Sequence, residues 1–143
     1  MEVTDGAKAS AIGTEVEVWA LKYVDIAAKD AARFLNEAQY AHAVDLCRQL
    51  AAEKNPRCPV SLEVDAIEDF FELKDKGGIL GKINLRIYFV VCDGEKSIVV
   101  LGCWKKESDG QVPQYIKARM KSRLRFVKGK MSNQKINRKG GGR

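Results

Sequence analysis

A β-hairpin between residues 85 and 104 constrains this fold more than any other part of the sequence. Two runs of β-branched and aromatic residues, 85–92 and 97–104, have the length of strands and are separated by Asp-Gly-Glu-Lys. Asp-Gly between such runs predicts a hairpin turn, because the turn needs a positive φ and glycine adopts it without steric cost. Both runs are apolar at nearly every position, so we expect them to be central strands of a sheet that is covered on both faces.

Basic residues interrupt this hairpin at two places. Arg86 lies inside the first run, and Lys105 and Lys106 follow the second. With an even number of loop residues, the strand period of two puts Arg86 and Tyr88 on the same face as Cys103 and Lys105, whereas a three-residue loop breaks that grouping. The alternative for Arg86 is a buried arginine that only pairs with a carboxylate.

The length and the charge distribution define the domain organisation. A chain of 143 residues that is 45% hydrophobic can bury one core. We expect a disordered N-terminus over 1–13, a single domain over 14–127, and a basic disordered tail over 128–143. Residues 104–143 hold 13 Lys and Arg against two acids, while the whole chain has a net charge of +6. This segregation predicts a positive field suited to nucleic acid or to an acidic protein partner.

Several classes of protein lack support in the sequence. No apolar run approaches the roughly 18 residues of a membrane span, and the N-terminus lacks the pattern of a secretion signal, so we expect a cytoplasmic protein without a membrane partner. The four cysteines have neither zinc-site spacing nor the density of a disulfide scaffold, which predicts reduced thiols and no metal site. No nucleotide-binding or hydrolase motif is present, and we expect no cofactor.

The N-terminal half predicts one strand and a long helical segment. Residues 14–23 alternate at first and favour a strand, and Asp25 can cap an alanine-rich helix that continues to about Lys54. Asn36 and Gln39 have the spacing of a capping box, so either one bent helix or a helical hairpin fits.

The stretch between this helical segment and the hairpin predicts little regular structure. Residues 67–73 favour a short strand, and three glycines at 77–81 indicate a turn. His42 is the only histidine, and no second metal ligand lies one helical turn away, so we interpret it as a packed or exposed side chain.

A basic helix is predicted from Pro113 to about Phe126. Apolar residues at helical spacing can dock this helix on the domain: Ile116, Met120, Leu124 and Val127. Basic residues form a second stripe and flank the apolar one: Lys117, Lys121, Arg125 and Lys128 in the stripe, with Arg119 and Arg123 beside the apolar face.

The block from residue 71 to residue 127 resembles a known family. Its features are the segment FELK at 71–74, Arg86 in a strand, the Lys-Lys pair at the end of the next strand, Pro113, and a basic helix over 119–126. In this order they resemble the RelE/ParE superfamily of bacterial toxins, in particular its HigB-like, phage-derived branch. The resemblance implies an α+β fold with a small antiparallel sheet, an N-terminal helical segment on one face and a basic C-terminal helix.

The function implied by this resemblance is that of a toxin in a type II toxin–antitoxin system. Such a protein would be a metal-independent mRNA endoribonuclease, free or ribosome-dependent, held inactive by a cognate antitoxin. The ribose 2′-hydroxyl would attack the adjacent phosphate, which requires cations near the developing charge and groups that carry protons. Arg86 would hold the phosphate, Lys105 and Lys106 would stabilise the phosphorane or act as acid and base, and Tyr115 is a weaker catalytic candidate. The RNA-binding candidates on the helix are Lys117, Arg119, Lys121, Arg123 and Lys128.

Two other functions stay open. A ParE-like toxin would bind a protein such as DNA gyrase without nuclease chemistry, and a non-catalytic homologue would bind RNA or DNA only. The C-terminal region has no histidine to carry protons, and the loop over 107–112 differs from that of typical relatives.

Overall fold

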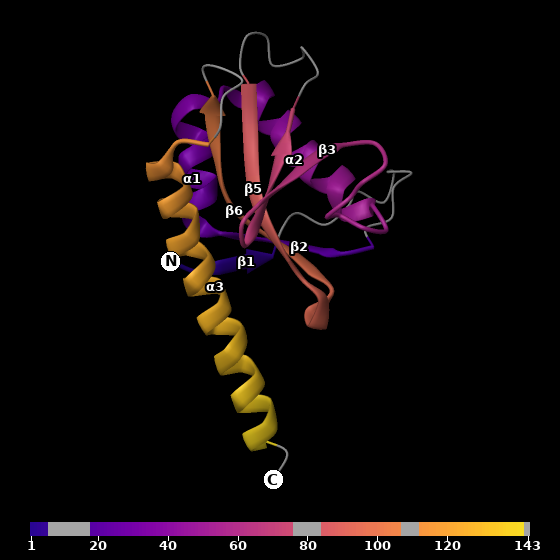
Figure 1. The fold of residues 1–143 in the computed structure, drawn as a ribbon, viewed down its shortest axis with the longest axis vertical. Coiled ribbons are helices and arrows are strands. Elements are labelled where there is room, and N and C mark those ends of the chain that lie inside the picture. The colour runs from indigo at the N-terminus through magenta and orange to yellow at the C-terminus, as the bar shows by residue number, and fades with distance from the viewer. Residues whose placement is uncertain (6–17, 76–83, 107–111, 142–143) are drawn as a thin grey trace.

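The computed structural model describes residues 1–5, 18–75, 84–106 and 112–141, and all statements below concern these residues. The fold is α+β, with one mostly antiparallel sheet of six strands in the order β1-β2-β6-β5-β4-β3 (Figure 1). The strands are β1 Val3–Asp5, β2 Ala20–Val24, β3 Glu63–Ile67, β4 Phe70–Lys74, β5 Asn84–Cys92 and β6 Ser97–Lys106. The helices are α1 Asp25–Phe34, α2 Glu37–Ala52 and α3 Gln114–Gly141, and a 3₁₀ turn, η1, covers Asp93–Glu95.

The predicted hairpin is confirmed, because β5 and β6 pair antiparallel in the middle of the sheet. Its turn differs from the expectation in one respect. The positive φ, +50°, belongs to Lys96, the fourth loop residue, and not to Gly94. The loop makes one 3₁₀ turn first, closed by a 3.0 Å hydrogen bond from Lys96 N to Asp93 O, and only its last residue must then turn back into the strand.

A β-bulge changes the register of the hairpin halfway along. The loop has four residues, an even number, and Cys92 pairs with Ser97 as expected. Phe89 then pairs with Val100 but Tyr88 pairs with Gly102, so Leu101 is an extra residue on β6. Beyond the bulge every side chain of β6 faces the side opposite to the one that uninterrupted alternation predicts.

Each face of the sheet has its own hydrophobic core. On one face, buried side chains of β4, β5 and β6 pack with α1 and α2: Leu73, Leu85, Ile87, Phe89, Ile98 and Cys103 from the sheet with Ala31, Leu46, Cys47 and Leu50 from the helices. On the other face, Phe70, Tyr88, Val99 and Leu101 pack with Ile116, Met120, Leu124 and Val127 of α3. The nearly continuous apolar runs of β5 and β6 follow from this double coverage.

The predicted helical segment is two helices, α1 and α2, separated at Leu35 and Asn36. The capping box is present, since Gln39 N donates to Asn36 Oδ1 (2.8 Å) and Asn36 N donates to Gln39 Oε1 (2.9 Å). Asp25 is not the N-cap residue but the first residue of α1, where its carboxylate accepts hydrogen bonds from Glu2 N and Ile26 N. These bonds hold the pKa of Asp25 below its ordinary value.

Three predicted segments differ from the structure. The single strand over 67–73 is wrong: β3 and β4 are two strands joined by a tight turn, in which Glu68 has a φ of +53°. Val3–Asp5 pairs with β2, although this end was expected to be disordered. The backbone of α3 continues to Gly141, far past the predicted end at Phe126, and Figure 1 shows its last turns extending beyond the sheet. The glycine-rich turn over 77–81 lies outside the described residues.

Candidate nucleic-acid interface

The inner face of α3 anchors this helix on the sheet. Ile116, Met120, Leu124 and Val127 are each 3% exposed or less. Their spacing of three to four residues makes one stripe that faces the sheet, and the opposite side of the helix carries the exposed residues. Pro113 precedes the first turn, and its carbonyl accepts hydrogen bonds from Ile116 N and Lys117 N. The sequence thus fixes which side of α3 faces solvent.

A buried ion pair fixes the middle of α3. Arg123 is 4% exposed, and its Nη1 donates to Asp30 Oδ2 of α1 (2.6 Å) and to the carbonyl oxygen of Leu101 (3.0 Å), the bulge residue of β6. Gly102 makes room for this arrangement, since a Cβ there would collide with Arg123 Nη1 and would lie 2.7 Å from Met120 Cε. Arg123 was predicted to bind RNA, but the structure places it inside the domain.

Two lysines of α3 are held by the β3–β4 turn. Lys117 Nζ lies 3.1 Å from Glu68 Oε1, and Lys121 Nζ contacts Glu68 Oε2. Hydrogen bonds from Lys121 and Lys117 lower the pKa of the Glu68 carboxyl group. Both lysines are half-buried, so these predicted RNA-binding residues already have a carboxylate partner.

The outer face of α3 carries exposed cations. Arg119, Arg125 and Lys128 are exposed, and within the described segments no acidic side chain forms an ion pair with them. Lys130 is also exposed and lies over the ring of Phe126, with Nζ 5.7 Å from the centroid. The whole of α3 contains ten Lys and Arg residues and no acid. This surface attracts polyanions, because the helix has no acidic side chain that would neutralise its basic residues.

An aromatic pair lies where β6 ends and α3 begins. The rings of Trp104 and Tyr115 meet edge to face, with centroids 5.7 Å apart. Tyr115 is 56% exposed, so a large part of this residue remains accessible to solvent. Exposed aromatic rings beside cations are a typical surface for stacking nucleic-acid bases. Tyr115 was a candidate from the sequence, whereas Trp104 was not. Trp104 reaches Tyr115 because the bulge in β6 turns its side chain toward α3.

Arg86, which pairs with Trp104 across β5 and β6, is buried and does not reach the surface. It is 3% exposed, its Nε lies 3.9 Å from Glu72 Oε1, and its Nη1 donates to the carbonyl oxygen of Leu85. Tyr88 is buried on the same face, where burial, followed by the negative charge of Glu72, raises the pKa of its hydroxyl group. The alternative interpretation of Arg86, a buried arginine paired with a carboxylate, describes this geometry.

The predicted grouping of Arg86 with Lys105 is wrong. Because of the bulge, Arg86 pairs with Trp104, while Lys105 pairs with Leu85, whose side chain belongs to the core beneath α1 and α2. Lys105 is exposed and lies on the opposite face of the sheet from Arg86. The backbone of Lys106 pairs with Asn84, but its side chain lies outside the described residues.

A largely buried pair of polar side chains, His42 and Asp75, was not predicted from the sequence. His42 Nε2 of α2 lies 3.4 Å from Oδ2 of Asp75, which follows β4, and both side chains are largely buried. The two residues are 33 positions apart, and no motif signals that they meet. They lie on the α2 side of the sheet, away from the outer face of α3.

The described segments contain neither a cluster of metal ligands nor a helix that could span a membrane. No three His, Cys, Asp or Glu side chains of these segments are close enough together to hold a metal ion. No helix among them combines the length and the apolar character needed to cross a membrane. All four cysteines are free thiols.

Comparisons with known proteins do not identify a family for this chain. No protein-family model matches it, and no curated protein matches it.

Proposed function

We propose that this protein is an RNA-binding toxin of the RelE/ParE type, and that the outer face of α3 is its RNA-binding surface. The observation that carries the proposal is the charge of α3, with ten basic residues, no acid, and Arg119, Arg125 and Lys128 exposed on one docked helix. Phosphate neutralisation by such side chains supplies most of the sequence-independent affinity for nucleic acid. The toxin assignment rests on the resemblance of residues 71–127, and the expected protein partner is a cognate antitoxin.

Charge reversal on the outer face tests the binding surface. We expect Arg119→Glu with Arg125→Glu to weaken binding to single-stranded RNA at least tenfold. Each lost phosphate contact should also reduce the log–log salt slope by about 0.7. Fluorescence anisotropy with a labelled RNA at several salt concentrations measures both quantities.

The matched control reverses the charge of two exposed basic residues outside α3, one in α1 and one just after α2. Arg33→Glu with Lys54→Glu changes the net charge equally but leaves α3 intact. It should keep nearly the full affinity and salt slope. Equal losses in the two double variants would mean that only net charge matters, and the proposed surface would be rejected.

Endoribonuclease activity is the second candidate, favoured by the exposed Tyr115 of α3, whose ring packs on Trp104 near the end of β6. Trp104 holds this ring next to the end of β6, on the face of the sheet opposite to the Lys105 side chain. The proposed centre is therefore the junction of β6 with α3, with Tyr115 and Arg119 on the helix side. Arg86 is left out of direct substrate contact, because it is buried against Glu72.

A conservative substitution tests this centre. Tyr115→Phe keeps the ring on Trp104 but removes the hydroxyl, and proton transfer by a positioned side chain is worth about 10²–10⁴-fold in rate. We expect RNA cleavage, with and without ribosomes, to fall by such a factor while RNA affinity stays the same. Unchanged cleavage would remove Tyr115 from the centre. Growth arrest by a wild-type protein that cleaves no RNA would instead support a ParE-like toxin.

A further inference from the structure

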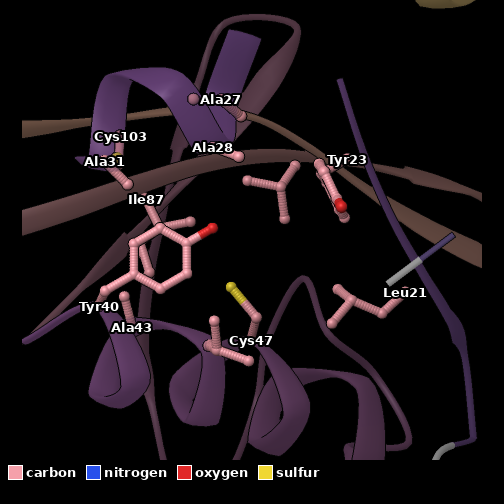
Figure 2. Close-up of a pocket in the computed structure, with 13 residues that line it drawn as sticks. Leu21, Tyr23, Ala27, Ala28, Ala31, Tyr40, Ala43, Cys47, Ile87 and Cys103 are labelled. Carbon is pink, nitrogen blue, oxygen red and sulfur yellow. The ribbon is translucent and has the colours of Figure 1, made fainter. Parts of the chain in front are cut away.

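A cavity of about 250 Å³ lies between α1, α2 and the sheet (Figure 2). Small side chains create it: Ala27 and Ala31 are four apart on one face of α1, and Ala43 and Cys47 are four apart on the facing side of α2. Protein interiors rarely contain voids much larger than a water molecule. An apolar void of roughly 150 Å³ already admits benzene, so this one has room for a ligand of about two fused rings.

The walls of the cavity carry no charged side chain. Burial raises the pKa of the Cys47 and Cys103 thiols to about 12, so both stay protonated and line the space as small apolar groups. A charged ligand would find no partner here and would lose its hydration. The walls therefore select an uncharged, mainly apolar molecule.

Two tyrosines supply the polar groups of the cavity. Tyr40 extends from α2 and Tyr23 from β2, and Figure 2 shows the hydroxyl oxygens of both turned toward the open space. Burial raises the pKa of Tyr40, which keeps its hydroxyl neutral and able to donate a hydrogen bond. Both tyrosines are half-buried, as are Ala28 and Val44, so this side of the cavity is reachable from solvent.

We propose that the cavity binds a small neutral aromatic molecule that carries one hydrogen-bonding group, with the rings against the alanines and the polar group at the tyrosine hydroxyls. The volume fits a bicyclic ring system, the walls carry no charge, and each of the two tyrosine hydroxyls points into the space. This site is separate from the outer face of α3, because it lies on the other face of the sheet.

Two probes of matched shape test the proposal, 1-naphthol and 1-methylnaphthalene. We expect calorimetry to show that the full-length protein binds both, with 1-naphthol about fivefold tighter, as one added neutral hydrogen bond allows. Tyr40→Phe should remove most of that preference and leave the affinity for 1-methylnaphthalene within about twofold. Absence of binding by the wild-type protein at the solubility limit of both probes would overturn the proposal.

Filling the cavity gives the second test. Ala43→Leu should reduce the affinity for 1-naphthol at least tenfold, while Ala41→Leu, at an exposed position of the same helix, should leave it unchanged. If Ala43→Leu does not fold, Ala28→Leu at the half-buried side replaces it, with the same expected loss. Binding that survives in the folded filled variant would locate the probe elsewhere and reject the cavity as its site.

Discussion

At the scale of single residues, neighbours in space decide what each cation of α3 does. Arg119 and Arg123 are one helical turn apart and look alike in the sequence. Arg119 is exposed, whereas Arg123 forms a buried ion pair with Asp30. The two side chains leave the helix in slightly different directions, so one reaches solvent and the other reaches the interior.

Arg123→Met should destabilise the domain by about 3–5 kcal/mol, because it leaves Asp30 buried without its partner. Arg119→Met, at an exposed position, should change the free energy of unfolding by no more than about 0.5 kcal/mol. Urea denaturation followed by circular dichroism measures both variants. Similar, small effects would show that the Arg123–Asp30 pair contributes little.

Gly102→Ala should also destabilise the domain, by about 1–3 kcal/mol, since a Cβ would press on Arg123 and Met120. Gly94→Ala is the control, because nothing lies within 4 Å of a Cβ at that position. Thermal unfolding of the two variants gives the comparison. A Gly102 variant as stable as the Gly94 variant would mean that α3 shifts to make room.

At the scale of elements, local signals define the ends of the helices and the turns. The capping box at Asn36 separates α1 from α2. Asn36→Ala should cost about 1 kcal/mol of stability, because it removes the acceptor for Gln39 N. Gln49→Ala, at a half-buried position inside α2 where only a bond to Asp45 is lost, should cost only about a few tenths of a kcal/mol. Denaturation midpoints of both variants check this, and an equal cost would argue against the cap.

The link between α3 and the β3–β4 turn should depend on pH. The pKa of Glu68 is lowered in the folded protein, so its bonds to Lys117 and Lys121 contribute stability above its ordinary pKa of 4.5. That contribution should disappear as the pH falls through the lowered value. The stability difference between the wild type and Glu68→Gln should therefore be present at pH 7 and smaller at pH 3. A difference that does not change between these pH values would contradict the link.

At the scale of the whole molecule, α3 serves two purposes along its length. Its first half closes the core on one face of the sheet, and its last turns extend beyond every other element (Figure 1). The charged end therefore adds length to the proposed RNA-binding face without being needed for the core.

Deletion of residues 131–143 removes four basic residues and should weaken RNA binding with a shallower salt dependence. The free energy of unfolding should stay within about 0.5 kcal/mol of the full-length value, because Val127 is the last buried residue among the α3 side chains that the structure describes. Anisotropy titrations and urea denaturation measure the two effects. An unchanged salt slope would show that this end does not contact RNA.

Local patterns along the chain predict most of the individual elements. The apolar runs of β5 and β6 predicted the hairpin and its central position, and the apolar stripe predicted how α3 docks. The Asn36–Gln39 spacing predicted the capping box but left open one bent helix or a helical hairpin. These features rest on periodicity and on contacts within a few residues, which a linear pattern encodes directly.

Which side chains meet depends on how the elements pack in three dimensions. The bulge at Leu101 reverses the facing of β6, so that Trp104 rather than Cys103 lies opposite Arg86, and Lys105 lies on the other face. The burial of Arg123 against Asp30 and of Arg86 against Glu72, and the cavity between α1 and α2, likewise depend on elements distant in the chain. One extra residue in a strand moves all later side chains to the opposite face, and no local pattern records where that residue is accommodated.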